Sequence, residues 1–403
     1  MKTSRWAEYT ELMALFFLQW TAMSIWFVPL SAVLEAHGLG GLRPYAFATG
    51  AIAAFISPLI FGAMADRHFA PVKVLRGLAV ATAGALALAT FSIERGWPTG
   101  VVLGLIQILA LCSAPSASIS TSIIFSRLQN PKREFGPIRA MGTIGWMCGC
   151  WLVSGMGADA STLAGYMAAG AWLVIAAFTF LLPNVPPPES QGRVTWRERL
   201  GWDALVLLKN RDTRVVFITA ALLNIPLAAF YPLTPPHLKQ LGFQHVSAWM
   251  TLGQTTEIIA MLALAGLFLR LRLKWIFLAG LGFSFVRFIF CALDGPWWLL
   301  TGITLHGLSY TFYFITAQIY LDERIDPAWR ARAQALFSLM TGGVGNLIGY
   351  LGTGWWFNAC TQPATGTQWP LFWGGLAVVV AVITGYFLTA YRGQSSGLAR
   401  VKS

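Results

Sequence analysis

Long apolar stretches recur along the whole chain and are separated by short polar links. A helix of about 20 apolar residues is long enough to cross the hydrocarbon core of a membrane. The pattern therefore predicts an all-α integral membrane protein with twelve transmembrane helices. The predicted spans are residues 11–34, 44–65, 72–93, 98–125, 135–156, 162–182, 213–234, 246–269, 274–293, 296–320, 331–357 and 369–391.

The longest polar link divides these spans into two sets of six. It opens with Pro183 and three consecutive prolines, Pro186 to Pro188. We expect an N-terminal half of residues 1–183, a cytoplasmic linker of residues 184–212 and a C-terminal half of residues 213–403. In the linker, apolar residues at helical spacing beside arginines predict an amphipathic helix lying on the anionic membrane surface. These apolar residues are Trp196, Leu200, Ala204 and Leu207.

The two halves resemble each other around one motif. Asn130-Pro131 precedes the run 142–145 (GTIG), and Asp326-Pro327 precedes the run 342–345 (GGVG). Two related sets of six spans joined by a basic link are typical of transporters whose halves rock about a site near the membrane midplane. The sequence thus predicts a transporter that works by alternating access.

Composition supports a membrane protein, and the distribution of the basic residues explains its net positive charge. Of the 403 residues, 56% are hydrophobic and 11% are charged, whereas soluble domains carry about 25% charged residues. We therefore do not expect a soluble multidomain enzyme. The net charge of +12 does not indicate binding to nucleic acid. Most basic residues lie at the amino terminus, in the links that follow the even-numbered spans and in the C-terminal tail. This bias predicts an inner-membrane protein with both termini in the cytoplasm.

A polar stripe is predicted on the fifth span. Arg139 lies just inside that span, where an arginine is costly and often functional. Successive residues of a helix turn by about 100°, so Arg139, Thr143, Trp146 and Cys150 share one face. The guanidinium, the hydroxyl and the indole could hold a planar polar solute. The alternative is an arginine that extends to the cytoplasmic headgroups.

Glu257 is the carboxylate that lies deepest within a predicted span. Gln254 precedes it by three residues on the same side of the eighth span. Apolar surroundings disfavour an ionised carboxylate, so Glu257 is a candidate carrier of the coupled proton. The alternative is a structural ion pair with Arg287 in the ninth span, although Asp294 is the closer match to Arg287 in depth.

Further polar residues interrupt other spans. In the tenth span, His306, Tyr310 and Tyr313 share a face, which is usual for packing but is also consistent with a surface that faces the solute. Asn224 interrupts the seventh span just before Pro226. Three residues of the first span could line the same cavity, namely Gln19, Trp20 and Trp26.

Other chemistries find no support in the sequence. The five cysteines are scattered, which argues against a metal or disulfide site. The five histidines are dispersed and no phosphate-binding loop is present, so we expect neither a membrane-embedded enzyme nor an ATP-driven step. We also do not expect a sensor, because the sequence shows no appended soluble domain that could transmit a signal. We expect no cofactor, with the proton gradient as the source of energy.

The link after the second span resembles the signature loop of the major facilitator superfamily. It contains Gly62, Asp66 and Arg67. In that superfamily the glycine permits close helix packing, and the resemblance implies that Asp66 and Arg67 help to close the cytoplasmic gate. The alternative is a solvated charged turn.

Nearly the whole chain resembles the nucleoside:proton symporter family within this superfamily. The motifs that carry the resemblance are Phe17-Leu18-Gln19 with Trp26, residues 127–130, residues 137–139 and 142–145, residues 182–186, residues 201–204 with Lys209-Asn210, Gln254 with Glu257, Arg287-Phe288, and residues 332–334. The resemblance implies proton-coupled nucleoside uptake by a major facilitator fold. It also implies that certain residues contact the sugar and the base, namely Arg139, Thr143, Trp146, Gln254, Glu257, His306 and Tyr310.

The chain departs from the family pattern at three positions. Thr311 stands where the family usually has an aspartate, and His306 stands where characterised members often have a tyrosine. Asn224 matches one polar position of the seventh span, but the second such position is Leu227. These departures bear on proton coupling and substrate choice, and Thr311 remains a candidate to line the cavity. We expect a monomer that carries a nucleoside or a related ribosylated solute. The alternative is a carrier of the same mechanism for another small polar metabolite, such as a sugar derivative.

Overall fold

The computed structural model describes residues 5–65, 70–129, 131–183, 195, 202–326 and 329–393. Helices make up almost all of this part of the chain, and each of the twelve predicted spans coincides with one helix or with a run of helical segments. The chain folds into two compact units. The first comprises Met1–Arg193 with Gln244–Ala248, and the second comprises Val194–Phe243 with Trp249–Ser403.

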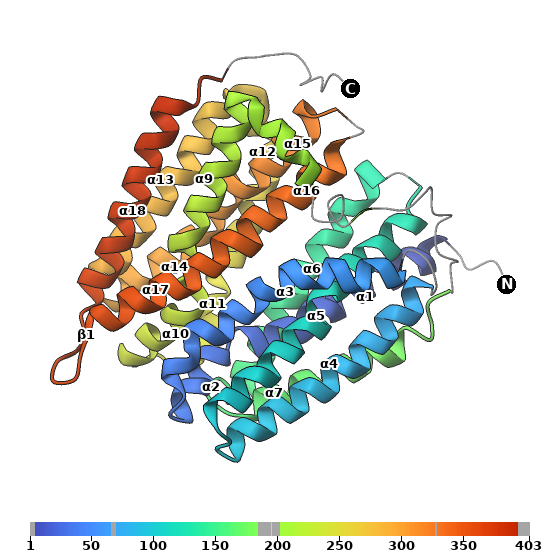
Figure 1. Cartoon of the computed structure of the whole chain (residues 1–403), viewed down its shortest axis with the longest axis vertical. Coiled ribbons are helices and arrows are strands. Elements are labelled where there is room, and N and C mark those ends of the chain that lie inside the picture. Colours follow the sequence, from blue (N-terminus) through green and yellow to red (C-terminus); the bar gives the residue numbers. More distant parts are fainter. Residues whose placement is uncertain are drawn as a thin grey trace. The chain divides into compact units, whose positions relative to one another are not determined.

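The first unit is a bundle of long helices (Figure 1). Helix α1 packs on α6 and α7, α4 packs on α5 and α7, and α3 packs on α5. Its elements are α1 (Arg5–Phe27), α2 (Leu30–Ala36), the short 3-10 helix η1 (Gly40–Leu42), α3 (Arg43–Ala65), α4 (Pro71–Glu94), α5 (Thr99–Arg127), α6 (Pro131–Gly155) and α7 (Leu163–Phe178).

Glycines let α6 lie directly against α1. A Cβ atom on Gly142 would come within 2.6 Å of the Trp20 ring, and one on Gly145 would overlap the carbonyl oxygen of Phe17. Small residues at such interfaces are the usual means by which membrane helices approach closely. This contact fixes the rotation of α6 and so the direction in which Arg139 and Trp146 face.

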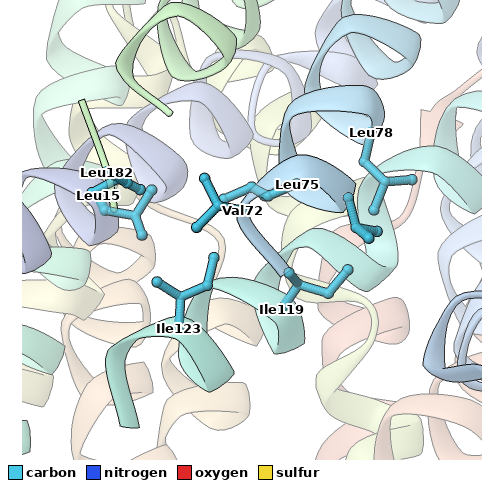
Figure 2. Close-up of a cluster of buried hydrophobic side chains, with 8 residues drawn as sticks. Leu15, Val72, Leu75, Leu78, Ile119, Ile123 and Leu182 are labelled. Atoms are coloured by element: carbon cyan, nitrogen blue, oxygen red, sulfur yellow. The ribbon is translucent and has the colours of Figure 1, made fainter. Parts of the chain in front are cut away.

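A cluster of aliphatic side chains joins α1, α4 and α5 in the first unit (Figure 2). Leu15 of α1 and Leu75 of α4 are fully buried there, and Phe178 at the end of α7 packs against the cluster. The other members are Val72, Val74, Leu78, Ile119, Ile123 and Leu182. Side chains that interlock in this way hold membrane helices together by van der Waals contact.

The second unit contains both continuous and broken helices. Helix α13 packs on α14 and on α18, with which it lies side by side in Figure 1, and α12 packs on α14. Its elements are the 3-10 helix η2 (Trp202–Lys209), α9 (Arg211–Leu227), α10 (Phe230–Gln240), α11 (Val246–Met250, which begins in the segment grouped with the first unit), α12 (Leu252–Arg270), α13 (Leu273–Ala292), α14 (Pro296–Tyr310), η3 (Thr311–Ile315), α15 (Thr316–Arg324), α16 (Arg330–Ser338), η5 (Leu339–Gly345), α17 (Asn346–Ala359), the strands β1 (Thr361–Gln362) and β2 (Gly366–Thr367), and α18 (Trp369–Ala390).

Two spans of the second unit contain π-helical turns. The turn η3 separates α14 from α15, and η5 separates α16 from α17. π-Helical turns shift the hydrogen-bonding register and are frequent at functional sites. The predicted motif at residues 342–345 falls within η5, and Thr311 begins η3.

The predicted linker is only partly described. Trp196 and Leu200 of its proposed amphipathic helix lie outside the described residues. The described part is the 3-10 helix η2, in which Ala204 and Leu207 are buried. Helix η2 packs on α9 and α16.

Seven helical stretches among the described residues are long and apolar enough to cross a membrane. They are Arg5–Ala36, Pro71–Glu94, Thr99–Arg127, Arg211–Gln240, Leu273–Ala292, Arg330–Ala359 and Trp369–Ala390. Together with the shorter apolar helix α7, they agree with the predicted multi-pass, all-α membrane protein.

Candidate functional site

Arg139 of α6 faces an aromatic group contributed by α1. Its guanidinium carbon lies 5.5 Å from the centroid of the Trp20 ring, within the range of a cation–π contact. Trp20 also packs against Trp146 of α6, with ring centroids 6.0 Å apart. The structure therefore brings Arg139 and Trp146 of the predicted stripe to the same indole. The ring of Phe27 also packs against Trp146, with centroids 5.9 Å apart.

Three side chains of this group carry hydrogen-bond donors, namely Trp20, Thr143 and Arg139. The Nε1 atom of Trp20 is buried and has no hydrogen-bond partner in the described part of the chain. Thr143 lies one turn after Arg139 and is buried. An indole N–H, a hydroxyl and a half-buried guanidinium can all donate to oxygen atoms of a solute.

The other two candidates of the first span are buried. The side-chain amide of Gln19 donates to the Ser116 hydroxyl at 2.7 Å and accepts from the Ser120 hydroxyl at 3.0 Å. Gln19 thus joins α1 to α5, and both ends of its amide are engaged. Trp26 is also buried.

Asn224 of α9 is bound to the broken eleventh span. Its Nδ2 atom donates to the carbonyl oxygen of Thr341 and to Oδ1 of Asn346, both at 2.7 Å. Thr341 lies within the π-helical turn η5, where the backbone register is altered, so the amide supplies a donor to a carbonyl of that turn. Asn224 therefore stabilises the irregular helix, whatever else it contacts.

Gln254 of α12 is linked to an aromatic residue of α10. Its Nε2 atom donates to the hydroxyl of Tyr231 at 3.1 Å, while its Oε1 atom is buried without a hydrogen-bond partner among the described residues. The Tyr231 ring meets the His306 ring edge to face, with centroids 6.5 Å apart. Gln254 and His306 thus share a neighbour.

His306 of α14 is held between a ring and a cation. It stacks on Phe230 at 4.0 Å with an interplanar angle of 16°, and Nη1 of Arg287 lies 2.6 Å from its Nδ1 atom. Arg287, which the sequence suggested as a partner of Glu257 or Asp294, therefore bonds to the histidine. Asp294 instead lies 2.9 Å from Nε2 of His237.

The aromatic face of the tenth span continues beyond His306. Its ring is 6.2 Å from that of Tyr310, and Tyr310 stacks on Phe314 at 5.2 Å. Tyr313 is fully buried against Phe277 and Phe387, where it packs within the unit.

Glu257 is half-buried on α12, and its backbone is close to Thr311. The Thr311 hydroxyl lies 3.5 Å from the carbonyl oxygen of Glu257. Thr311 is fully buried and faces α12.

The proposed gate residues Asp66 and Arg67 lie outside the described residues. The nearby Arg76 of α4 is described. It donates to the hydroxyl of Thr179 at 2.8 Å and lies over the Phe180 ring at 3.6 Å. Arg76 thus ties the start of α4 to the end of the sixth span.

Several contacts in these groups cannot be predicted from the sequence. Phe230 and Tyr231 follow the break after α9, where an ideal helical wheel no longer applies. Trp20 lies on a different helix from Arg139, and spacing along one helix carries no information about that contact. Among the described residues, no group of three or more His, Cys, Asp or Glu side chains could hold a metal ion.

Comparison with known proteins places the chain in a family. It matches the family described as "Nucleoside H+ symporter" over residues 7–396. It is 34% identical to YegT of Escherichia coli (strain K12) over 412 residues, which cover 97% of this chain and 96% of YegT. It is 27% identical to the xanthosine permease of the same organism over 391 residues, which cover 91% and 92% of the two chains.

The fold agrees with a solved structure. The crystal structure of a mutant of the nucleoside transporter NupG matches with a TM-score of 0.87 and 25% identity, covering 95% of this chain and 100% of that chain. The predicted major facilitator fold is therefore confirmed.

The fold and the apolar helices define a multi-pass transporter of the inner membrane, and not an enzyme. The chain belongs to the nucleoside H+ symporter family. Membership of a proton symporter family implies that the proton gradient supplies the energy for transport.

Proposed function

We propose that this chain imports nucleosides together with protons, as a monomer with both termini in the cytoplasm. The observation that carries the proposal is the pairing of flat aromatic rings with hydrogen-bonding side chains inside the helices of each unit. A nucleoside offers the matching chemistry, because its base has a flat face and its edges and sugar carry donors and acceptors.

In the first unit, Arg139, Thr143 and Trp146 are the proposed contacts with the solute. Trp146 and Trp20 offer indole faces for stacking, and Arg139 offers a planar fork of donors. Gln19 is a weaker candidate, because its amide already bonds to two serines of α5. Trp26 is proposed only as a lining residue.

In the second unit, the proposed contacts lie mainly on α12 and α14. Gln254 and His306 supply hydrogen bonds, and Tyr310 supplies a ring within the aromatic series from His306 to Phe314. Asn224 is included because its Oδ1 atom remains an acceptor after Nδ2 has bonded to the eleventh span.

Glu257 is proposed to carry the proton and to contact the solute. It is half-buried in an apolar helix beside Gln254. A carboxylate in such surroundings can exchange a proton when the solute and the solvent change places around it. Asp66 and Arg67 are proposed to act in the cytoplasmic gate.

The names of the relatives support a nucleoside as the solute. One relative is a xanthosine permease and another, NupG, is a nucleoside permease. The same transport mechanism could serve a sugar derivative, but stacking on the rings of Trp20, Trp146 and Tyr310 favours a base over a sugar alone.

Uptake by the purified protein in proteoliposomes tests this proposal. Labelled nucleosides and labelled sugars are offered with an inward proton gradient and without one. We expect nucleosides to accumulate only with the gradient, and sugars to remain at the level of empty liposomes. Accumulation of a sugar but of no nucleoside would establish the alternative substrate class.

A further inference from the structure

The contact between Arg287 and His306 fixes the hydrogen-bonding character of the histidine. Nη1 of Arg287 lies 2.6 Å from Nδ1 of His306. A guanidinium has only donors, so Nδ1 must be the acceptor. A doubly protonated imidazole has no acceptor to offer. The ring is therefore the neutral tautomer that carries its proton on Nε2.

The surroundings keep this arrangement rigid. Arg287 is 1% exposed, and its guanidinium lies over the rings of Phe230 and Phe288, at 4.9 Å from each centroid. The His306 ring stacks on the same Phe230. Turning the imidazole over would exchange Nδ1 for a carbon and leave the buried guanidinium without this bond, which is costly.

Glycines fix the helix that carries His306. A Cβ atom on Gly302 would come within 2.9 Å of the carbonyl oxygen of Arg287. A Cβ atom on Gly307 would overlap the backbone of Gly253 and Glu257. Helix α14 therefore lies in close contact with both α13 and α12, and it cannot rotate to present another edge of His306 without separating from them.

His306 and Gln254 each offer one hydrogen-bonding atom to a solute. The contact with Arg287 occupies Nδ1 of His306, so Nε2–H is the donor that the ring can offer to a solute. Oε1 of Gln254 is a buried acceptor without a partner in the same part of the chain, since the amide nitrogen bonds to Tyr231. The two side chains contact the same tyrosine. One fixed donor and one acceptor are therefore available in one cluster.

We propose that this pair selects solutes whose base carries a carbonyl beside a ring N–H, and that Arg287 is the positioning residue that sets the selection. The carbonyl would accept from Nε2–H of His306, and the ring N–H would donate to Oε1 of Gln254. Oxo bases of the inosine and uridine type present this edge. Amino bases of the adenosine and cytidine type present a donor and an acceptor in the reverse order. This inference rests on the proposed transport of nucleosides.

His306 stands where characterised members of the family often have a tyrosine, and comparing the two side chains tests the proposal. A tyrosine hydroxyl can rotate and can both donate and accept, so it does not distinguish an oxo base from an amino base. The fixed imidazole does. A donor facing a donor loses a hydrogen bond in a buried site, which corresponds to about tenfold in affinity.

The experiment compares matched pairs of nucleosides in proteoliposomes. Uptake is measured for inosine against adenosine and for uridine against cytidine, and the ratio within each pair is the readout. We expect the wild type to favour the oxo member by about tenfold. His306→Tyr and Arg287→Met should bring both ratios near one. The first replaces the imidazole with a hydroxyl that can donate or accept, and the second leaves the imidazole free to carry its proton on either nitrogen. Arg287→Lys keeps a cationic donor for Nδ1 and should retain the preference.

Controls separate this inference from the proposed function. His37→Gln, at an exposed histidine, should leave both ratios unchanged. Thermal stabilisation of each variant by inosine and adenosine gives a second readout that does not require transport. Uptake of all four nucleosides with ratios near one in the wild type would overturn the selection alone, as would a full preference in Arg287→Met. Uptake of none of the four would instead contradict the proposed function.

Discussion

The hydroxyl of Thr311 lies 3.5 Å from the carbonyl oxygen of Glu257. Because Thr311 is fully buried, its side chain serves the contact between the tenth span and α12. The position at which the family usually has an aspartate thus adjoins the backbone of the proposed proton carrier. Any ionisable group introduced there must either donate to that carbonyl or be repelled by it.

Replacing Thr311 tests this placement. An aspartate at this position can donate to the Glu257 carbonyl only while it is protonated, so Thr311→Asp should lose stability as the pH rises. The matched variant Thr311→Asn has a neutral amide that donates at every pH. We expect the melting temperature of Thr311→Asp to fall between pH 5 and pH 8 relative to that of Thr311→Asn. Parallel melting curves across this range would contradict the placement.

Glycine packing between α1 and α6 gives a prediction about stability. In Gly145→Ala the new methyl group would overlap the carbonyl oxygen of Phe17, which should cost about 1–3 kcal/mol and lower the melting temperature. The control is Gly84→Ala in α4, where a Cβ atom would meet nothing within 4 Å. Alanine is the better helix former, so this control should be neutral or slightly stabilising. Equal melting temperatures for the two variants would show that the close contact is not required.

Nucleoside binding is predicted to depend on the planar guanidinium of Arg139 and not on its charge alone. Arg139→Lys keeps the charge near Trp20 but loses the paired donors, so nucleoside affinity should fall by about tenfold or more. Arg95→Lys is the matched control, because Arg95 also lies over an aromatic ring, that of Phe91 at 5.1 Å, but outside the proposed contacts. Equilibrium binding to both variants measures the difference. An unchanged affinity in Arg139→Lys would favour the interpretation that this arginine only reaches toward the headgroups.

Replacing Glu257 is predicted to abolish proton-driven uptake but not the exchange of nucleoside across the membrane. Glu257→Gln cannot release a proton, so uptake driven by a pH gradient should disappear while exchange of internal for external nucleoside continues. Glu94→Gln, which changes an exposed carboxylate bonded to Tyr166, is the control and should retain both activities. Gradient-driven accumulation by Glu257→Gln at the wild-type level would exclude Glu257 as the carrier.

The spans could be predicted because membrane helices leave a strong apolar signal. Each predicted range, including the broken first and seventh spans, coincides with helical structure. The break after Leu227 and the π-helical turn that begins at Thr311 could not be predicted, because a helical wheel assumes an uninterrupted α-helix. These breaks determine which way the residues beyond them face.

The partners of buried charges were harder to predict than the spans. The helical rise per residue suggests that Arg287 and Asp294 lie at similar depths. Depth says nothing about rotation about the helix axis, and the structure pairs Arg287 with His306 and Asp294 with His237. The contact of Arg139 with Trp20 likewise depends on the glycines that bring α6 onto α1, and sequence spacing within one helix does not contain that information.

The most direct test of proton-coupled nucleoside import is the movement of protons itself. Proteoliposomes containing the wild type and an internal pH-sensitive dye are prepared with the same pH on both sides, and a nucleoside is added outside. We predict acidification of the lumen that depends on the nucleoside and is absent in Glu257→Gln. Nucleoside entry at a normal rate without any change in internal pH would contradict symport.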